Sequence, residues 1–219
     1  MAVLTNPHWE TVVPELCTVM EMIGQQAFAD RFYLAGGTAL ALQLGHRRSI
    51  DLDFFSEKDG IEAKTRQEII RALDCRDSQV LESEDGNLLC LLNGVHTGFF
   101  GYGYQLIGEP VSLLGLSLAS LSDIGLMKCD ALVSRGSRKD FYDLYTLGQI
   151  FDLGDLLELG KLKYPHFRDF PLIVIEGMVL FDNADRDEPP DLLVDLPWPQ
   201  VRDYFIEKSR QLGRTWFNL

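Results

Sequence analysis

Two glycines and two aspartates have the types and spacing that could support chemistry. Gly36 and Gly37 precede Thr38 and a short apolar stretch, and Asp51 follows Gly37 after thirteen intervening residues. Asp53 comes two positions later, so on a β-strand both carboxylates would point to the same face. Like charges so placed repel each other, and a divalent cation between them would remove the repulsion. The pattern indicates a metal site, although two aspartates alone would equally fit a solvated strand face.

The two glycines indicate what the metal would accompany. A Gly-Gly turn followed by a hydroxyl residue and a helix leaves backbone N–H groups at a helix N-terminus, where they and the helix dipole favour an anion. Glycine also lets a ligand approach the backbone closely. We therefore expect Gly36, Gly37 and Thr38 to hold the phosphates of a nucleotide. A Gly-Gly pair alone would also fit a tight turn that binds nothing.

Three polar residues lie between the glycines and the aspartates. Arg47 and Arg48 could both serve a phosphate pocket, and the spacing favours Arg47. Ser49 shares the predicted strand face of Asp51 and Asp53, so its hydroxyl could contact a phosphate. A structural hydrogen bond to a neighbouring strand is the alternative for Ser49.

The combined stretch "GGTALALQLGHRRSIDLDFF" resembles the signature of the nucleotidyltransferase fold, a Gly-Gly or Gly-Ser turn followed by Asp–hydrophobic–Asp/Glu. More narrowly, it is similar to the AbiEii-type nucleotidyltransferase toxins of abortive-infection and toxin–antitoxin systems. Their R-x-S-x-D-L-D-F pattern is matched by Arg47, Ser49, Asp51 and Asp53. The resemblance implies a metal-dependent nucleotidyltransferase that uses an NTP with Mg²⁺ (or Mn²⁺). It also implies an RNA acceptor, foremost the 3′ end of tRNA, and a cognate antitoxin as partner.

A second block, residues 121–147, carries the same resemblance. In that family a lysine on a helix is followed by A-[LI]-x-x-R and by a K-D-x-x-D-L segment. The matching residues here are Lys128, Ala131, Leu132, Arg135, Lys139, Asp140, Asp143 and Leu144. The resemblance makes Lys128 the cation that stabilises the leaving pyrophosphate, and it gives Asp140 a catalytic role. Asp140 or Asp143 could complete a carboxylate set or orient Lys128, whereas Asp140 could simply favour the helix start.

One expected feature of the family is missing. Many nucleotidyltransferases carry a third carboxylate on a later strand, and the matching segment here, residues 95–102, has no Asp or Glu. His96 could act as a base or could be an ordinary polar residue of a hairpin. Another carboxylate could substitute, one metal could suffice, or catalysis could be lost. The alternatives to RNA modification are therefore a catalytically silent nucleotide-binding regulatory module and a nucleotidyltransferase that modifies a protein.

The elements that must position these residues can be read from periodicity and turn residues. Alternation predicts a strand over 49–55, and Asn93-Gly94 is the signal of a hairpin. Gly45 would end the helix that follows the glycines. The other predicted elements are a helix within 8–29 interrupted near Pro14, a strand over 32–35, and helices over 38–44 and 61–73.

From residue 120 onward the sequence predicts helices. Two of them cover the second block, with Gly136 between them, a third covers 171–181, and the last starts near Pro199. The acidic, proline-rich stretch 182–200 is predicted to be a connecting loop. The fold class is therefore α+β: a nucleotidyltransferase-like mixed sheet with flanking helices (1–117), followed by a helical domain (118–219).

Composition narrows the classes of function. The formal net charge of −13 argues against a generic nucleic-acid binder, because phosphate contacts supply most of such a protein's affinity. The four cysteines and four histidines are dispersed, so we expect reduced thiols and no zinc site. No apolar run is long enough to span a membrane, and the N-terminus lacks the regions of a signal peptide. We therefore expect a cytoplasmic protein.

Overall fold

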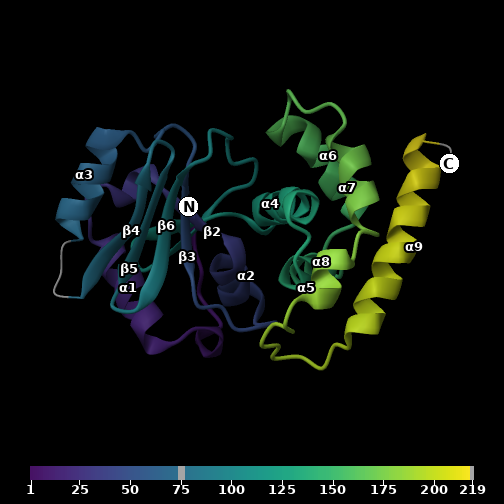
Figure 1. Ribbon diagram of the computed structural model, residues 1–219, viewed down its shortest axis with the longest axis horizontal. Coiled ribbons are helices and arrows are strands. Elements are labelled where there is room, and N and C mark those ends of the chain that lie inside the picture. The colour runs from purple at the N-terminus through teal and green to yellow at the C-terminus, as the bar shows by residue number, and fades with distance from the viewer. Residues whose placement is uncertain (74–76, 218–219) are drawn as a thin grey trace. The chain divides into compact units, whose positions relative to one another are not determined.

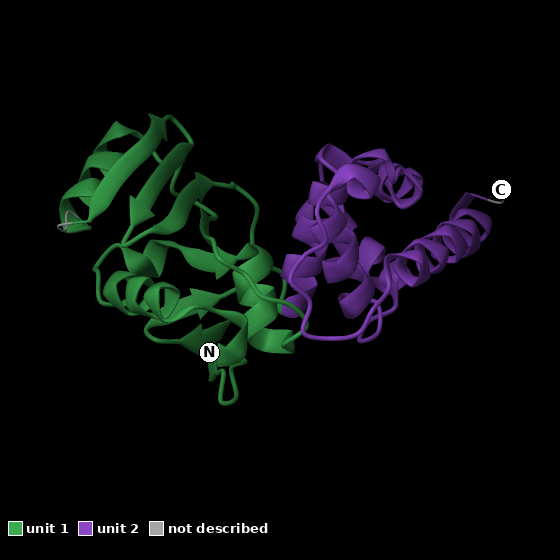
Figure 2. Ribbon diagram, turned by 60° about the horizontal axis from the view of Figure 1, so that its bottom comes forward, with its two compact units in different colours: residues 1–120 green, residues 121–219 purple. Residues whose placement is uncertain are grey.

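The computed structural model describes residues 1–73 and 77–217. They form two compact units, residues 1–120 and residues 121–219, coloured green and purple in Figure 2. The first unit contains a mixed β-sheet with helices and the second is helical, which confirms the predicted fold class. The division lies three residues after the predicted boundary at 117, and the assignment of the two parts as domains stays a prediction.

The sheet of the first unit has eight strands in the order β1-β7-β8-β2-β3-β6-β5-β4 (Figure 1). Their bounds are β1 (Ala2–Val3), β2 (Tyr33–Ala35), β3 (Leu52–Ser56), β4 (Ser78–Glu84), β5 (Asn87–Leu92), β6 (Val95–Gly101), β7 (Val111–Leu113) and β8 (Leu116–Leu118). At its centre, β3 runs antiparallel to β2 and parallel to β6. The strand that carries Asp53 therefore lies between the strand that leads to the glycines and the strand where a third carboxylate was expected.

Alternation along β3 separates a buried face from a half-exposed one. Leu52 and Phe54 are fully or almost fully buried, and the ring of Phe54 stacks on that of Phe99 at 5.2 Å between centroids. Phe28 adds an edge-to-face contact with Phe99 at 5.8 Å. A one-residue shift of β3 would turn Phe54 out of the core and bury Asp53. Core packing therefore fixes the register in which the Asp53 carboxylate is half-exposed.

The helices of the first unit are α1 (Pro14–Gly24), α2 (Gly36–Leu44) and α3 (Ala63–Ala72), with single 3₁₀ turns at Trp9–Thr11 and Ala29–Arg31. Proline suits a first helical position, so the predicted 8–29 helix begins at Pro14. Gly45 ends α2 in the left-handed conformation (φ 68°), as predicted. Figure 1 shows α3 beside β4, at one edge of the sheet.

Two strand predictions have different outcomes. The hairpin is confirmed, since Asn93 (φ 48°) and Gly94 (φ 81°) have the positive φ angles of a type I′ turn between β5 and β6. The predicted 49–55 strand is wrong at its start, because β3 begins at Leu52. β2 ends at Ala35, opposite Asp53, where α2 takes over the chain, so residues before Leu52 have no partner on β2.

The second unit contains α4 (Leu121–Ser134), α5 (Arg138–Leu147), α6 (Leu153–Lys163), α7 (Phe170–Gly177), α8 (Asp182–Arg186) and α9 (Trp198–Phe217). Helices α4, α5, α7 and α9 were predicted, whereas α6 was not. The stretch 182–200 is not entirely a loop, because it begins with α8. The indole of Trp198 donates a hydrogen bond to Asp185, which ties α8 to the start of α9.

Cysteine chemistry agrees with the prediction where the structure describes it. Cys17, Cys90 and Cys129 carry free thiols, and Cys75 lies outside the described residues. Burial raises the pKa of Cys90 to about 11 and that of Cys129 to about 12, which makes both poor nucleophiles. Among the described residues, none of the helices has the length and apolarity needed to cross a membrane.

Candidate active site

The start of α2 is shaped by the absence of two side chains. Gly36 has a φ of +67°, and a Cβ atom there would lie 2.7 Å from Oδ2 of Asp53. A Cβ atom on Gly37 would collide with Nη2 of Arg47 and lie 3.1 Å from Oγ of Ser49. Because the first two residues of α2 have no side chains, the carboxylate of Asp53 and the guanidinium of Arg47 lie against its main chain.

This juxtaposition has an electrostatic meaning. A helix N-terminus attracts anions, and the N-cap residue of α2, Ala35, has no side chain that could cap the helix. The guanidinium of Arg47 strengthens that attraction, but the carboxylate of Asp53 opposes it. A cation bound to the carboxylate would resolve the conflict, because it would bridge Asp53 and an anion held by the helix.

Thr38 has a different position from the one predicted for a phosphate ligand. Its side chain is buried, and its hydroxyl contacts both Oγ of Ser49, at 2.9 Å, and the main-chain carbonyl of Asp51. Since a carbonyl can only accept, the Thr38 hydroxyl donates to it, which leaves the Ser49 hydroxyl to donate to Thr38. Thr38 and Ser49 thus hold Asp51 against α2, and the partner of Ser49 is a helix residue rather than the neighbouring strand of the structural alternative.

The two aspartates are restrained differently. Asp53 sits within β3, paired with Ala35 on β2 and with Gly98 on β6. Asp51 lies just before the strand and is positioned through its carbonyl. Both side chains are half-exposed. Two neighbouring carboxylates of this kind match the donor set that Mg²⁺ takes together with phosphate oxygens and waters.

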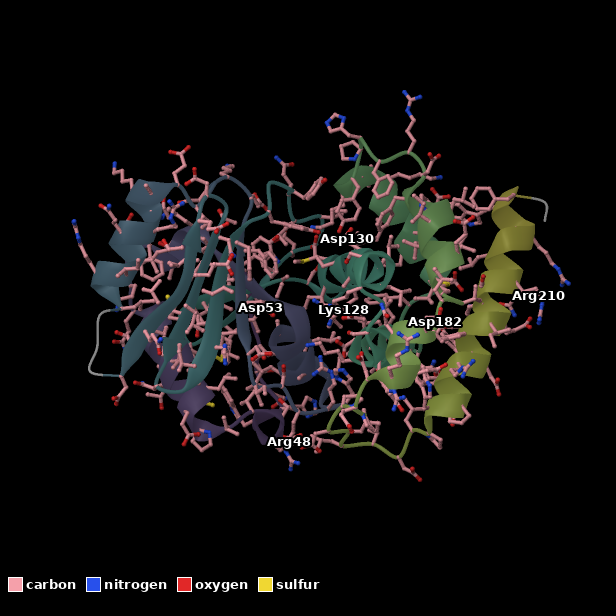
Figure 3. The ribbon with its side chains drawn as sticks, in the orientation of Figure 1. Arg48, Asp53, Lys128, Asp130, Asp182 and Arg210 are labelled. Atoms are coloured by element: carbon pink, nitrogen blue, oxygen red, sulfur yellow. The ribbon has the colours of Figure 1, made fainter. Side chains whose placement is uncertain are left out.

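Arg47 and Arg48 are placed differently by the fold. Arg47 is buried, and its Nη1 donates to the carbonyl of Arg48 at 3.0 Å. Arg48 is exposed and is labelled in Figure 3. Only Arg47 is held against Gly37, at the N-terminus of α2.

The strand expected to carry a third carboxylate is β6. The residue of β6 opposite Asp53 is Gly98, and His96, two positions earlier on the same face, is exposed. A Cβ atom on Gly98 would lie 2.5 Å from the ring of Phe100. The phenyl ring therefore occupies the space that a side chain at position 98, opposite Asp53, would take.

In the second unit, Lys128 on α4 lies against two aspartates of α5. Its Nζ is 2.9 Å from Oδ1 of Asp140 and 2.6 Å from Oδ2 of Asp143, and all three side chains are buried (Figure 3 labels Lys128). The fold thus joins the residues that the sequence singled out in 121–147. Of the alternatives considered for Asp140 and Asp143, this geometry matches the ion pair that orients Lys128.

Asp140 has further partners that the sequence did not reveal. Arg135 donates to both its oxygens, from Nε at 2.8 Å and Nη2 at 2.9 Å, and Ser137 donates at 2.6 Å. Burial acts to raise the pKa of Asp140. The hydrogen bond from Arg135, the charges of Lys128 and Arg135 and the Ser137 hydroxyl outweigh it and hold that pKa well below the usual range. Asp140 is therefore a fixed anion.

Comparison with known proteins gives this arrangement a family. Residues 18–86, which include the glycines and both aspartates, match the family model "Nucleotidyl transferase AbiEii toxin, Type IV TA system". An uncharacterized protein of Aquifex aeolicus (strain VF5) is 36% identical over 198 residues, which cover 88% of this chain and 93% of that protein. The chain belongs to the AbiEii nucleotidyltransferase toxin family.

Solved structures share the fold of this AbiEii protein. The nucleotidyltransferase toxin MenT4 of Mycobacterium tuberculosis H37Rv is 17% identical, with a TM-score of 0.61 over 90% of this chain and 82% of MenT4. JHP933 of Helicobacter pylori is 16% identical, with a TM-score of 0.55 over 92% of this chain and 91% of that one. A putative nucleotidyltransferase of H. pylori gives 0.53 at 15% identity, over 95% and 94% of the two chains.

The residues predicted for this AbiEii site fall into two groups. Gly36, Gly37, Thr38, Arg47, Ser49, Asp51 and Asp53 come together in the first unit, and Lys128 and Asp140 come together in the second. Within 1–73 and 77–217, no group of three or more His, Cys, Asp or Glu side chains could hold a metal. A metal at Asp51 and Asp53 would therefore take its remaining ligands from the nucleotide and water. The roles of these residues stay predictions.

Proposed function

We propose that this AbiEii protein transfers a nucleoside monophosphate from an NTP to the 3′ hydroxyl of an RNA, with tRNA as the foremost acceptor. The observation that carries the proposal is the contact of Asp53 with the N-terminus of α2. This contact places a carboxylate, which can hold a cation, beside a helix end that can hold the phosphate bound to that cation. A nucleoside triphosphate with its divalent metal supplies both the anion and the cation.

The residues of the first unit then have definite tasks. The backbone N–H groups of Gly36 and Gly37 and the guanidinium of Arg47 bind the triphosphate. Asp51 and Asp53 hold Mg²⁺ or Mn²⁺, which when bound neutralises phosphate charge and orients the α-phosphate. Thr38, through its hydrogen bond to the carbonyl of Asp51, keeps the carboxylate of that residue at the required position.

The role proposed for Lys128 comes from the family resemblance. An ammonium near the β- and γ-phosphates stabilises the negative charge that develops on the leaving pyrophosphate. Asp140 and Asp143 hold the amine in one place through the two ion pairs. In the proposed reaction Lys128 is catalytic and Asp140 positions it.

The family description also supports a biological context. The family model describes a nucleotidyltransferase that is a toxin. We therefore expect that nucleotide transfer arrests growth. An antitoxin encoded nearby is the corresponding partner. Expression of the wild-type chain should therefore stop growth of a bacterial host, and expression of the Asp53→Asn variant should not.

The transfer reaction can be tested directly. The protein is incubated with each α-labelled NTP, Mg²⁺, total tRNA and a cell lysate, and the RNA and protein fractions are separated. The comparison uses Asp51→Asn, Asp53→Asn and, as a matched control, Asp30→Asn, which makes the same change at an exposed position outside the site. Label on RNA that EDTA and both site variants abolish, and that Asp30→Asn retains, is the expected result.

The other outcomes separate the rival functions. Label on protein would favour the enzyme that modifies a protein. NTP binding without transfer to either fraction would favour a regulatory module, for which the Gly98 opposite Asp53 is the structural reason. Equal transfer by the parent and both site variants would exclude Asp51 and Asp53 as metal ligands.

A further inference from the structure

Four aromatic residues continue the sheet face of Asp53 away from α2. We call them the aromatic platform: Phe55, Phe100, Tyr102 and Tyr104. The rings of Phe55 and Phe100 stack at 5.1 Å between centroids, and Tyr102 contacts Phe55 edge-to-face at 5.5 Å. Tyr104 extends the row, 5.0 Å from Tyr102. Phe55 lies two residues after Asp53 on β3, and Phe100 is its partner on β6.

The platform is accessible, unlike the core rings on the other face. Phe54 and Phe99 are almost completely buried, whereas Phe55, Phe100 and Tyr102 are half-exposed and Tyr104 is 37% exposed. Phe55 also stacks on the buried ring of Tyr33, but core packing does not explain the exposed surface of the other rings. Aromatic rings on an open sheet face are the means by which several protein modules stack unpaired bases.

The segment that carries the tyrosines is fixed by hydrogen bonds. The N–H groups of Tyr102 and Gly103 both donate to the carbonyl of Ser56, at 3.0 and 3.2 Å. The N–H of Leu106 donates to Oε1 of Glu57 at 2.7 Å. The end of β3 thus holds the chain beyond β6 in place, so both rings are presented in a preformed arrangement, which lowers the entropic cost of binding.

The order of the strands indicates which substrate the platform meets. The phosphate-binding end of α2 follows β2, Asp53 lies on β3, and the platform extends over β6 and the residues after it. In nucleotidyl transfer the attacking and leaving oxygens are roughly in line on opposite sides of the phosphorus. If the pyrophosphate leaves on the β2 side, the acceptor hydroxyl must approach from the β6 side, where the platform lies.

Charge gives a second argument for stacking. With a net charge of −13 the chain gains little from attraction to phosphates, which ordinarily supplies most of the affinity for a nucleic acid. Base stacking does not depend on net charge and contributes substantially at each stacked base. Stacking therefore gives an acidic protein a way to bind single-stranded RNA that does not depend on its net charge.

We propose that the aromatic platform binds the unpaired terminal bases of the RNA acceptor and positions its 3′ hydroxyl beside Asp53. The inference rests on the proposed function and adds to it the acceptor's binding site and its chemical class, a single-stranded 3′ end. Tyr104, the most exposed ring of the platform, is its most direct probe.

Binding can be measured without turnover. A fluorescently labelled, single-stranded RNA 12-mer of mixed sequence with a 3′-deoxy end is titrated with the full-length protein, and anisotropy is followed. The variants are Tyr104→Ala and Tyr104→Phe, with Phe167→Ala as a control at a ring that is 40% exposed in the second unit. An abasic 12-mer, which keeps the phosphates and lacks the bases, is the matched ligand.

The proposal predicts that Tyr104→Ala weakens binding of the 12-mer about 5- to 150-fold, the range expected for one lost stacked base. Tyr104→Phe and Phe167→Ala should stay within about twofold. Binding of the abasic 12-mer should be weak and insensitive to Tyr104→Ala. Equal binding of the 12-mer by the parent and Tyr104→Ala would overturn the proposal that the platform binds bases. Equal binding of the 12-mer and the abasic 12-mer would overturn it as well.

Two further outcomes keep this inference apart from the proposed function. If Tyr104→Ala lowers the affinity for the four NTPs and leaves that for the 12-mer intact, the platform binds the donor nucleotide and the inference is wrong. If the parent binds the 12-mer through Tyr104 yet transfers no nucleotide to RNA, the proposed function fails while the RNA site stands.

Discussion

The guanidinium of Arg47 occupies the space in which a Cβ atom of Gly37 would lie. Arg47 is buried with a full positive charge, and Gly37 has no side chain at the start of α2. Glycine is a weak helix former, and alanine at position 37 would favour the helix by about 1 kcal/mol. That cost is understandable if the position of the guanidinium matters more than the stability of α2.

The first prediction is that Gly37→Ala preserves the fold and weakens NTP binding about tenfold or more, a loss of roughly 1.4 kcal/mol. The new methyl group must displace the guanidinium, which is the flexible end of a side chain, so the backbone can stay in place. Isothermal titration calorimetry measures the affinity, and urea denaturation the free energy of unfolding. Gly60→Ala is the control, because a Cβ atom there would meet nothing within 4 Å. Unchanged NTP affinity in Gly37→Ala would show that Arg47 does not bind the nucleotide.

The second prediction concerns Thr38. Thr38→Val keeps the shape of the side chain but removes the donor to the Asp51 carbonyl, so the free energy of unfolding should fall by about 1–3 kcal/mol. Transfer activity should fall with it, since Asp51 would lose its anchor. Thr38→Ser, which restores the hydroxyl, should recover most of both. A stable but inactive Thr38→Val protein would instead favour direct contact of the hydroxyl with phosphate.

The third prediction is a pH dependence of stability. The pKa of Asp140 is lower in the folded state than its unfolded value of about 3.9, so its contribution is complete above that value and is lost as the pH falls through the folded pKa. The free energy of unfolding should therefore decrease below about pH 4. Asp140→Asn should be strongly destabilised at pH 7, and its difference from the parent should shrink towards pH 2. Asp182→Asn, at an exposed position, should follow the parent, and a constant difference between Asp140→Asn and the parent at all pH values would contradict the assignment.

The fourth prediction addresses a buried ion pair that the sequence did not suggest. Nζ of Lys163 on α6 lies 2.8 Å from Oδ1 of Asp123 on α4, and neither side chain is exposed. Lys163→Met should cost about 3–5 kcal/mol, because it leaves the Asp123 charge buried without this partner. The double variant Lys163→Met with Asp123→Leu should recover most of that loss, because hydrophobic pairs often replace buried ion pairs well. Chemical denaturation of the four proteins in the cycle gives the coupling energy, and additive losses would show that the pair is not coupled.

The elements predicted correctly from the sequence are those with local signals. Gly45, Gly136 and the Asn93-Gly94 turn mark ends that depend on a few residues, and α2, α4 and the β5–β6 hairpin end where those residues indicated. Strands β1, β7 and β8 have two or three residues and exist through pairing with distant segments. A three-residue strand has no measurable period, and β2, which is equally short, was predicted only because it leads into Gly36 and Gly37.

The candidate site shows the same division. The glycines and aspartates were recognisable because phosphate and metal chemistry demands those residue types at that spacing. Other contacts depend on how side chains pack after folding. Examples are the hydrogen bond from the Thr38 hydroxyl to the Asp51 carbonyl and the two hydrogen bonds from Arg135 to Asp140. The position of the β3 start at Leu52 likewise depends on where its partner β2 ends.

The ring of Phe100 beside Gly98 has a consequence for the history of the family. Because a side chain at position 98 and a large ring at position 100 compete for one space, the two positions should covary among homologues. We expect a lineage with an aspartate at position 98 to carry a smaller residue at position 100, or a ring turned out of this space. Ancestral reconstruction would then date the exchange of an acid for an aromatic surface at positions 98 and 100.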